Sequence, residues 1–373
     1  MNSNKILLSN KEEHIKPFIK WPGGKDSELE IIMKNFPKDF NKYLEPFIGG
    51  GAIFLNTRAK EYYINDKSKE LITLYSMIKS QNQSFYSYLE RINNNWNIIS
   101  IFVENNQNKL INLYKAEDLS IIESFINKNV DFFKNLVFTE SDFKILEYEL
   151  LKNMISKITR SKKIEYKKGK LPDHEILNNL ECCLKSAYYM YLRNLYNSFK
   201  IDDLPSQYSA IFYFIREFCY SSMFRYNNQG HFNVPYGGIS YNKKDFTTRI
   251  NQIKSVDLLN KLSKTNISCT DFEVFLTNQN LNQNDFIFLD PPYDTDFSTY
   301  AKNKFDKNDQ IRLSEYLKST KANFLLVIKE TDFIKSLYKD FYITSFEKKY
   351  LVSFKNRNNK KTNHLLIKNY GDK

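Results

Sequence analysis

Residues that bind metal ions or form disulfides are scarce in this chain. Its 373 residues include four cysteines and four histidines. The cysteines, at positions 182, 183, 219 and 269, show no C-x-x-C spacing, and the histidines lie far apart in the sequence. We therefore expect no disulfide framework, no zinc site and no other metal site.

Long apolar runs are missing as well. No run approaches the roughly 18 residues that a membrane-spanning helix needs, and we recognise no secretory signal. These two absences predict a cytoplasmic protein with reduced thiols and without a membrane partner.

The charge of the chain is strongly positive. Lysine and arginine number 55 against 43 aspartate and glutamate residues, which gives a formal net charge of +12. Such a molecule attracts polyanions, and nucleic acid is the obvious candidate. A biased codon supply would also produce a chain rich in Lys, Asn and Ile, so the charge alone does not decide the partner.

Two kinds of sequence pattern alternate along the chain. Residues 1–80 and 255–373 have α/β character, with strands expected at 43–44, 62–64, 286–289 and 324–328 and helices ending near 35 and spanning about 309–318. Residues 81–254 have a mainly helical pattern, as in Leu151, Met154, Ile155 and Ile158 at helical spacing. The α/β domain is thus predicted to be split around a helical module, with an extra insert at about 85–185. A basic stretch at 160–170 is either a phosphate-contacting loop or a solvated one.

The tetrapeptide Asp290-Pro291-Pro292-Tyr293 directly follows a predicted buried strand. An adenine amino group is a poor nucleophile because its lone pair is delocalised into the ring. Two acceptors that take both N–H hydrogens, the Asp290 carboxylate and the Pro291 carbonyl, would aim that lone pair at an electrophilic methyl. Tyr293 offers a ring on which an extruded base can stack. The same tetrapeptide could also be a simple strand-ending turn.

A glycine-rich turn from 45 to 51 lies between a short strand and a helix start. Its glycines allow a ligand to approach the backbone at the edge of the sheet. The turn lacks the G-x-G-x-x-G and G-K-[ST] patterns, so a nucleoside without phosphates fits better than a dinucleotide or a triphosphate. Asp66, after the next strand, is expected both to accept hydrogen bonds from ribose hydroxyls and to cap the helix that follows.

Four segments together resemble the Dam-type (D12 class) DNA adenine-N6 methyltransferases. Residues 18–25 (FIKWPGGK) are similar to the N-terminal motif of that family, 45–51 (EPFIGGG) to its cofactor loop, 225–237 (RYNNQGHFNVPYG) to a segment of its recognition domain, and 290–293 (DPPY) to its catalytic tetrapeptide. The resemblance covers about residues 1–75 and 190–370. It implies a Rossmann-like fold that uses S-adenosyl-L-methionine to methylate a flipped-out adenine in double-stranded DNA, with 81–254 as the target-recognition domain.

The resemblance also implies roles for individual residues. Lys25 would suit the methionine carboxylate of the cofactor, Asp66 its ribose, and Asp271 its adenine amino group. Arg225 would fork onto a guanine in the recognised site, or bind a phosphate. The catalytic candidates are Asp290, Pro291, Pro292 and Tyr293; the cofactor-binding candidates are Trp21, Gly23, Lys25, Glu45, Phe47, Gly49, Asp66, Asp271, Phe272 and Asp290; the DNA-binding candidates are Lys20, Arg225, Asn227 and Tyr220.

Some features depart from the family pattern. The family usually has an Asn-Gly pair before the recognition arginine, where this chain has residues 220–224 (YSSMF). The recognition sequence therefore stays open, as does the presence of a cognate restriction endonuclease; we expect a monomer in solution. The alternative functions are an RNA or protein-amide methyltransferase of the same fold and a non-catalytic DNA-binding subunit.

Overall fold

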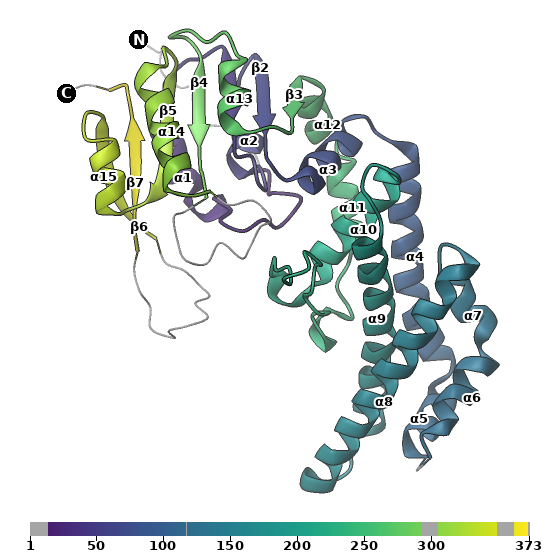
Figure 1. Cartoon of the computed structure of the whole chain (residues 1–373). Coiled ribbons are helices and arrows are strands. Elements are labelled where there is room, and N and C mark those ends of the chain that lie inside the picture. Colours follow the sequence, from purple (N-terminus) through teal and green to yellow (C-terminus); the bar gives the residue numbers. More distant parts are fainter. Residues whose placement is uncertain (1–13, 117, 293–304, 349–361, 372–373) are drawn as a thin grey trace, which may run out of the picture.

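The computed structural model describes residues 14–116, 118–292, 305–348 and 362–371, so the predicted stacking residue Tyr293 lies outside the described residues. Its centre is a seven-stranded sheet with the order β3-β2-β1-β4-β5-β7-β6 (Figure 1). Neighbouring strands are parallel, except that β7 runs antiparallel to both β5 and β6. The strands are β1 (Lys42–Glu45), β2 (Glu61–Asn65), β3 (Thr265–Ser268), β4 (Phe286–Leu289), β5 (Asn323–Lys329), β6 (Tyr342–Lys348) and β7 (Thr362–Lys368).

The sheet is doubly wound, as expected for a Rossmann-like α/β fold. From β1 the chain proceeds through β2 to β3 on one side, and from β4 to β5 on the other. The strand order therefore reverses between β1 and β4, which are parallel neighbours. In open α/β sheets a crevice forms beyond the carboxyl ends of the strands at this position, so a ligand site is expected there.

Helices cover both faces of the sheet and bury its apolar residues. All four residues of β4 are buried, as is typical of a strand covered on both faces. One core contains Leu44, Ile287 and Leu326 with α13, α14 and α15, and the opposite core contains Tyr43, Phe286 and Phe288 with α1, α2 and α3. The helices around the sheet are η1 (Asp26–Glu28), α1 (Leu29–Met33), α2 (Ala52–Asn56), α3 (Lys69–Lys79), α13 (Phe272–Thr277), α14 (Lys307–Ser319) and α15 (Asp332–Leu337).

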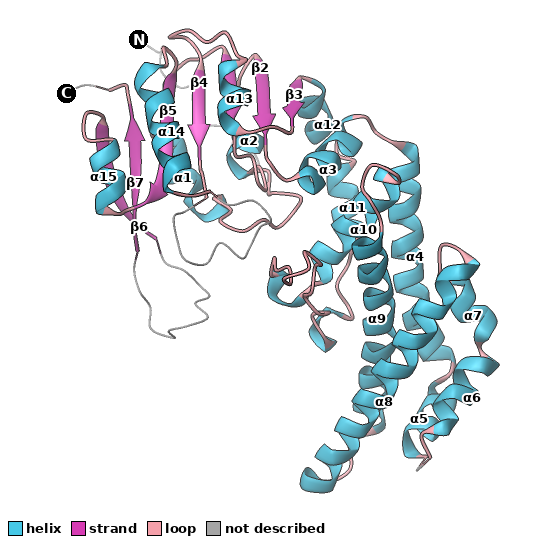
Figure 2. Ribbon diagram, viewed as in Figure 1, coloured by secondary structure: helices cyan, strands magenta, loops and turns pink. Residues whose placement is uncertain are grey.

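A long helical segment lies between β2 and β3 in the chain and projects from one end of the sheet (Figures 1 and 2). Its packing is dominated by α8 against α9 and by α10 against α4. Its helices are α4 (Gln83–Asn105), α5 (Gln107–Lys115), α6 (Ser120–Lys128), α7 (Val130–Asn135), η2 (Glu140–Asp142), α8 (Phe143–Lys168), α9 (Asp173–Ser198), α10 (Pro205–Phe218), η3 (Tyr220–Ser222), η4 (Ile239–Tyr241), α11 (Thr247–Ile253) and α12 (Val256–Ser263).

The basic stretch at 160–170 is not a loop, and our prediction of one was wrong. It forms the last turns of α8, which ends at Lys168. Gly169 then adopts a φ of +95°, a conformation open to glycine and unfavourable for most residues. We predicted a loop because of the many lysines, but a long helix that packs against α9 can carry basic residues on its solvent-exposed face.

The segment 219–237, after α10, folds back on itself as two limbs, which we call the recognition arch. Bridges join Cys219 to Tyr236 and Tyr226 to Phe232 across the two limbs. The aromatic side chains of Phe224 and Phe232 are buried between the limbs. The predicted recognition segment 225–237 is therefore an ordered element supported by α9 and α10.

Candidate active site

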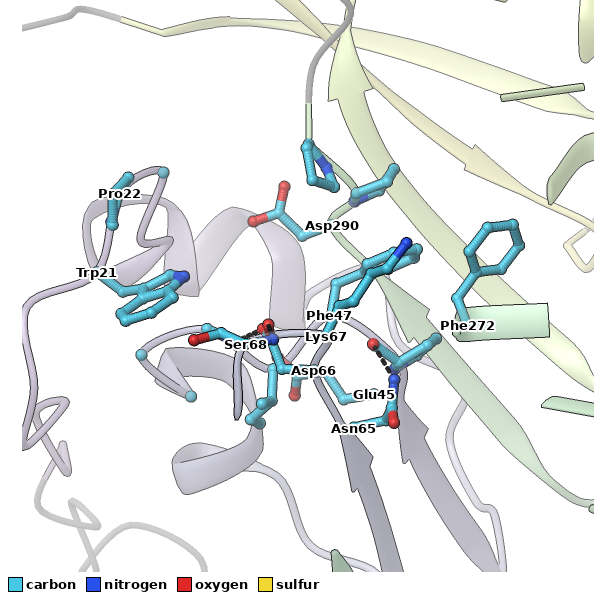
Figure 3. Close-up of a pocket in the computed structure, with 18 of the residues that line it drawn as sticks. Trp21, Pro22, Glu45, Phe47, Asn65, Asp66, Lys67, Ser68, Phe272 and Asp290 are labelled. Carbon is cyan, nitrogen blue, oxygen red and sulfur yellow. Dashed lines mark hydrogen bonds between the residues drawn. The ribbon is translucent and has the colours of Figure 1, made fainter. Parts of the chain in front are cut away.

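A cavity of about 350 Å³ opens at the switch point of the sheet. It is lined by the loops that follow β1, β2, β3 and β4, together with residues 21–25 (Figure 3). These residues end the segment 14–25 before η1, which we call the N-terminal arm. Its volume falls in the range of small-molecule sites. Chain segments more than 250 residues apart in sequence therefore meet at one pocket.

The glycine turn approaches Trp21 closely. Gly49 has a φ of +46°, and a Cβ atom there would lie 2.8 Å from Cδ1 of Trp21. Gly51 has a φ of +72°, and a Cβ atom there would lie 2.5 Å from the Tyr75 hydroxyl. Both positions thus require glycine, because the positive φ is unfavourable for other residues and because a Cβ atom would overlap a neighbouring side chain.

The end of β2 holds the glycine turn in place. Asp66 accepts hydrogen bonds from the backbone N–H of Gly49 at 3.1 Å and of Ser68 at 2.9 Å. Burial raises the pKa of Asp66 to about 6. Ser68, not Asp66, is the side chain that caps α3, because its hydroxyl accepts from Leu71. Asp66 therefore lines the cavity as a carboxylate bonded to the turn, and the prediction that it also caps the following helix was wrong.

A second side chain at the end of β2, Asn65, was not predicted. Its amide group donates to the carbonyls of Pro46 and Thr270 and accepts from the Thr270 N–H. It thereby joins the loops after β1, β2 and β3. A single asparagine beside an aspartate gives no sequence signal for such a role.

Aromatic rings form the wall of the cavity on the β3 side. Phe47 and Phe272 lie with ring centroids 5.6 Å apart, and each also contacts Phe305. Asp271 caps α13 and forms an ion pair at 2.7 Å with Arg312, whose guanidinium also stacks on Phe272. Arg312 lowers the pKa of Asp271 against the opposing effect of burial, so this carboxylate is charged at neutral pH.

Asp290 lies at the carboxyl end of β4 and is paired with Lys25. The Lys25 ammonium donates to Asp290 Oδ2 at 2.5 Å and to the Gly23 carbonyl at 2.8 Å, and its side chain is 3% exposed. Glu45, also buried, accepts from the Tyr43 hydroxyl at 2.6 Å, and burial raises its pKa well above the usual range. Asp290 is thus the acidic group beside a fixed cation, whereas Glu45 is in an environment that favours its neutral form.

The predicted site residues separate into two groups. All ten cofactor-binding candidates line the cavity, as do Pro291 and Pro292. Among these candidates, Lys25 forms an ion pair with Asp290. The four DNA-binding candidates do not line it. Lining residues that the sequence did not indicate include Asn65, Ser68, Phe224, Tyr226 and Phe305.

The DNA-binding candidates lie on the N-terminal arm and on the recognition arch. Arg225 is exposed, and its Nε donates to Asn233 at 2.9 Å. Among the described residues, none bonds the two terminal nitrogens of Arg225. Asn227 accepts from the backbone N–H groups of Gln229 and His231, so its side-chain oxygen shapes the turn of the arch. Lys20 is exposed, and Tyr220 is 49% exposed.

Sequence comparison now decides the family. A model of the D12 class N6 adenine-specific DNA methyltransferases matches residues 21–179 and 147–352, which together span most of the chain. The chain belongs to this family. The matched ranges also include 85–185, the segment that the sequence analysis predicted to be an extra insert.

Several relatives of similar length carry related names. The chain is 28% identical over 362 residues to the Type II methyltransferase M.CviBI of Paramecium bursaria Chlorella virus NC1A, covering 95% of this chain and 100% of the relative. It is 27% identical over 371 residues to the Type II methyltransferase M.MjaIII of Methanocaldococcus jannaschii, with 95% and 99% covered. It is 22% identical over 347 residues to a DNA adenine methylase of Haemophilus influenzae, with 91% and 87% covered.

Membrane spans and metal clusters are both missing from the described part of this D12 class member. No helix there is long and apolar enough to cross a bilayer. Within the same described residues, no three His, Cys, Asp or Glu side chains form a group that could hold a metal ion.

Proposed function

We propose that this chain transfers a methyl group from S-adenosyl-L-methionine to N6 of an adenine flipped out of duplex DNA at a specific sequence. Membership of the D12 class implies a methyl donor and a DNA substrate. The observation that carries the finer proposal is the pairing of Asp290 with the buried Lys25 at the switch point, beside the glycine turn.

The cavity residues fit the proposed cofactor chemically. Phe47 and Phe272 offer aromatic faces for an adenine, Asp66 a carboxylate for ribose hydroxyls, and the Gly49 turn a close backbone approach. When bound, the cofactor would supply an electrophilic methyl group on a sulfonium. Lys25, whose ammonium pairs with Asp290, would add positive charge near the cofactor carboxylate.

Asp290 and Pro291 would prepare the target amino group. The Asp290 carboxylate and the Pro291 carbonyl can each accept one N6 hydrogen, and proline fixes its own φ and therefore stiffens that acceptor. The bond from Lys25 holds the Asp290 carboxylate in a fixed orientation, so little reorganisation is needed when the base arrives. We expect most of the rate to come from this positioning and from exclusion of water.

The recognition arch would hold the duplex. We assign residues 81–254 to target recognition; the support for this is that Arg225 of the arch is exposed and is bonded to Asn233 through its Nε. Such a fork can pair with guanine O6 and N7, while Lys20 and Tyr220 would contact neighbouring phosphates or bases. The enzyme would act as a monomer, and a cognate restriction endonuclease would be its functional companion where one is encoded.

The same pocket could serve another planar amino group, such as that of a base in RNA. A direct test is transfer of tritiated methyl from S-adenosyl-L-methionine to duplex DNA, single-stranded RNA and protein, with Asp290→Ala as the inactive control. We expect label in duplex DNA, recovered as N6-methyladenine. Label in RNA or protein but not in DNA would overturn the proposal, and so would equal transfer by the Asp290→Ala enzyme.

A further inference from the structure

Arg216, in the last turn of α10, is a buried cation whose partners are carbonyl groups. Its side chain is 1% exposed. The two terminal nitrogens donate to the carbonyls of Met223 at 2.6 Å, Lys20 at 2.8 Å and Ser222 at 3.3 Å. Among the described residues no carboxylate pairs with it. Burying a charged guanidinium costs free energy unless hydrogen bonds compensate for the lost water. The planar guanidinium of Arg216 holds three carbonyls at once, which indicates a structural role.

Two of these carbonyls belong to a strained turn. Ser221 and Ser222, at the start of the recognition arch, both have a φ of +51°. Consecutive non-glycine residues rarely adopt this left-handed conformation, and it persists only where the surroundings enforce it. The bonds from Arg216 to Ser222 and Met223 span the end of this turn and so fix the direction in which Phe224 and Arg225 leave it.

The third carbonyl belongs to the N-terminal arm, one residue before Trp21. The guanidinium carbon of Arg216 lies 4.5 Å from the ring centroid of Phe224, and the Phe224 ring lies 4.8 Å from that of Trp21. Trp21 in turn packs directly on Gly49 of the glycine turn. One guanidinium therefore joins the base of the recognition arch to the wall of the cavity.

We infer that Arg216 is a positioning residue that couples occupancy of the recognition arch to the shape of the cofactor cavity. This inference rests on the proposed function. A shift of the arch on a duplex moves Phe224 and the Ser222 carbonyl, and Arg216 transmits that shift to the arm that carries Trp21. Binding of a recognised duplex and binding of the cofactor should then strengthen each other by the same factor.

The test measures binding of S-adenosylhomocysteine by calorimetry with and without a duplex that carries the recognised site. In the unaltered protein we expect the duplex to tighten this binding by about fivefold or more. In Arg216→Met, which keeps the length but has no donors, the factor should fall to about one, while each ligand still binds on its own. Phe224→Leu should reduce the factor to an intermediate value.

Lys185→Met is the matched control. Lys185 is also a buried cation, 2% exposed, and bonds Glu181 and the Asn242 carbonyl away from the arm. Its loss should lower the melting temperature but leave the coupling factor unchanged. Adding Ser222→Gly to Arg216→Met should recover stability, because glycine removes the strain of the turn, without recovering the coupling.

Each result decides between the two proposals. If the unaltered protein methylates DNA but shows no coupling, or if Arg216→Met retains it, the inference is overturned. Equal loss of coupling in Lys185→Met would reduce Arg216 to a general support of the fold. Absence of methyl transfer to DNA by the unaltered protein would instead overturn the proposed function. Should Arg216→Met fail to fold, Phe224→Leu decides: a reduced coupling factor supports the inference, and an unreduced factor overturns it.

Discussion

Replacing Gly49 by alanine should damage stability and cofactor binding by two separate effects. The backbone effect follows from the φ of +46°, where a side chain costs about 1–2 kcal/mol. The steric effect follows from the 2.8 Å separation between the new Cβ and Cδ1 of Trp21, an overlap that costs about 1–3 kcal/mol when a neighbour must shift. Together they predict a loss of about 2–5 kcal/mol in unfolding free energy.

Only the steric effect should reach the cofactor. Trp21 lines the cavity, so displacing its ring changes the space offered to the ligand. We expect the dissociation constant of S-adenosylhomocysteine to rise by about tenfold or more, which corresponds to about 1.4 kcal/mol. Isothermal calorimetry on the folded variant measures this, and chemical denaturation measures the stability.

Two neighbouring glycines separate the effects. Gly23 has a φ of +78°, but no atom lies within 4 Å of the position that a Cβ would take, so Gly23→Ala should show the backbone cost alone. At Gly24 the φ is not positive and the nearest atom to a Cβ would be the Trp21 carbonyl oxygen at 3.4 Å, so Gly24→Ala should cost little. If Gly49→Ala bound the ligand as tightly as Gly24→Ala does, the contact with Trp21 would not shape a cofactor site.

Three further outcomes are expected. Asp290→Ala should abolish methyl transfer and retain S-adenosylhomocysteine binding, because the acceptor faces the target base; near-normal turnover would contradict the mechanism. Burial raises the pKa of Asp66 to about 6, above its value of about 3.9 in the unfolded chain. The free energy that protonated Asp66 contributes to folding is therefore fully present below about pH 3.9 and is lost as the pH rises through about 6. Ribose binding needs the charged form, so affinity measured by calorimetry should weaken as the pH falls through about 6, and Asp66→Asn should bind weakly at every pH; a pH-independent affinity in the unaltered protein would remove Asp66 from the site. Replacing the exposed Lys163, Lys167 and Lys168 of α8 by glutamine should reduce the salt dependence of duplex binding without changing which sequence is methylated, and an altered sequence preference would mean that α8 contacts bases.

Apolar strands were the most predictable part of the fold. The four expected strands correspond to β1, β2, β4 and β5, since the short length of apolar runs such as Phe286–Leu289 favours a buried strand over a helix. Strand β3 was missed because Thr265–Ser268 contains one fully buried residue at the edge of the sheet. The basic end of α8 was misassigned because lysine density carries no information on whether the backbone is helical.

Residues in recognisable motifs were predicted to share one site and do line one cavity, whereas residues that act through the backbone were not predicted. Asp290 and Gly49 belong to segments with a chemical signature, and the structure brings both to one cavity. Arg216 belongs to no motif, but it is a charged residue within 207–218, a part of α10 in which every residue is buried. A charged residue within such a run is a signal that a sequence analysis could use.

The insertion of the helical segment between β2 and β3 has a consequence for how the chain folds. Asn65 and Thr270 are bonded although 205 residues separate them, and β2 and β3 are adjacent in the sheet. Closing a flexible loop of that length would cost about 5 kcal/mol in chain entropy before any strand pairing is gained. The helical segment, rich in contacts such as α8 with α9, can form locally and shorten the effective loop. We therefore expect the edge strand β3 to join late, so that mutations which slow helix assembly also delay completion of the sheet.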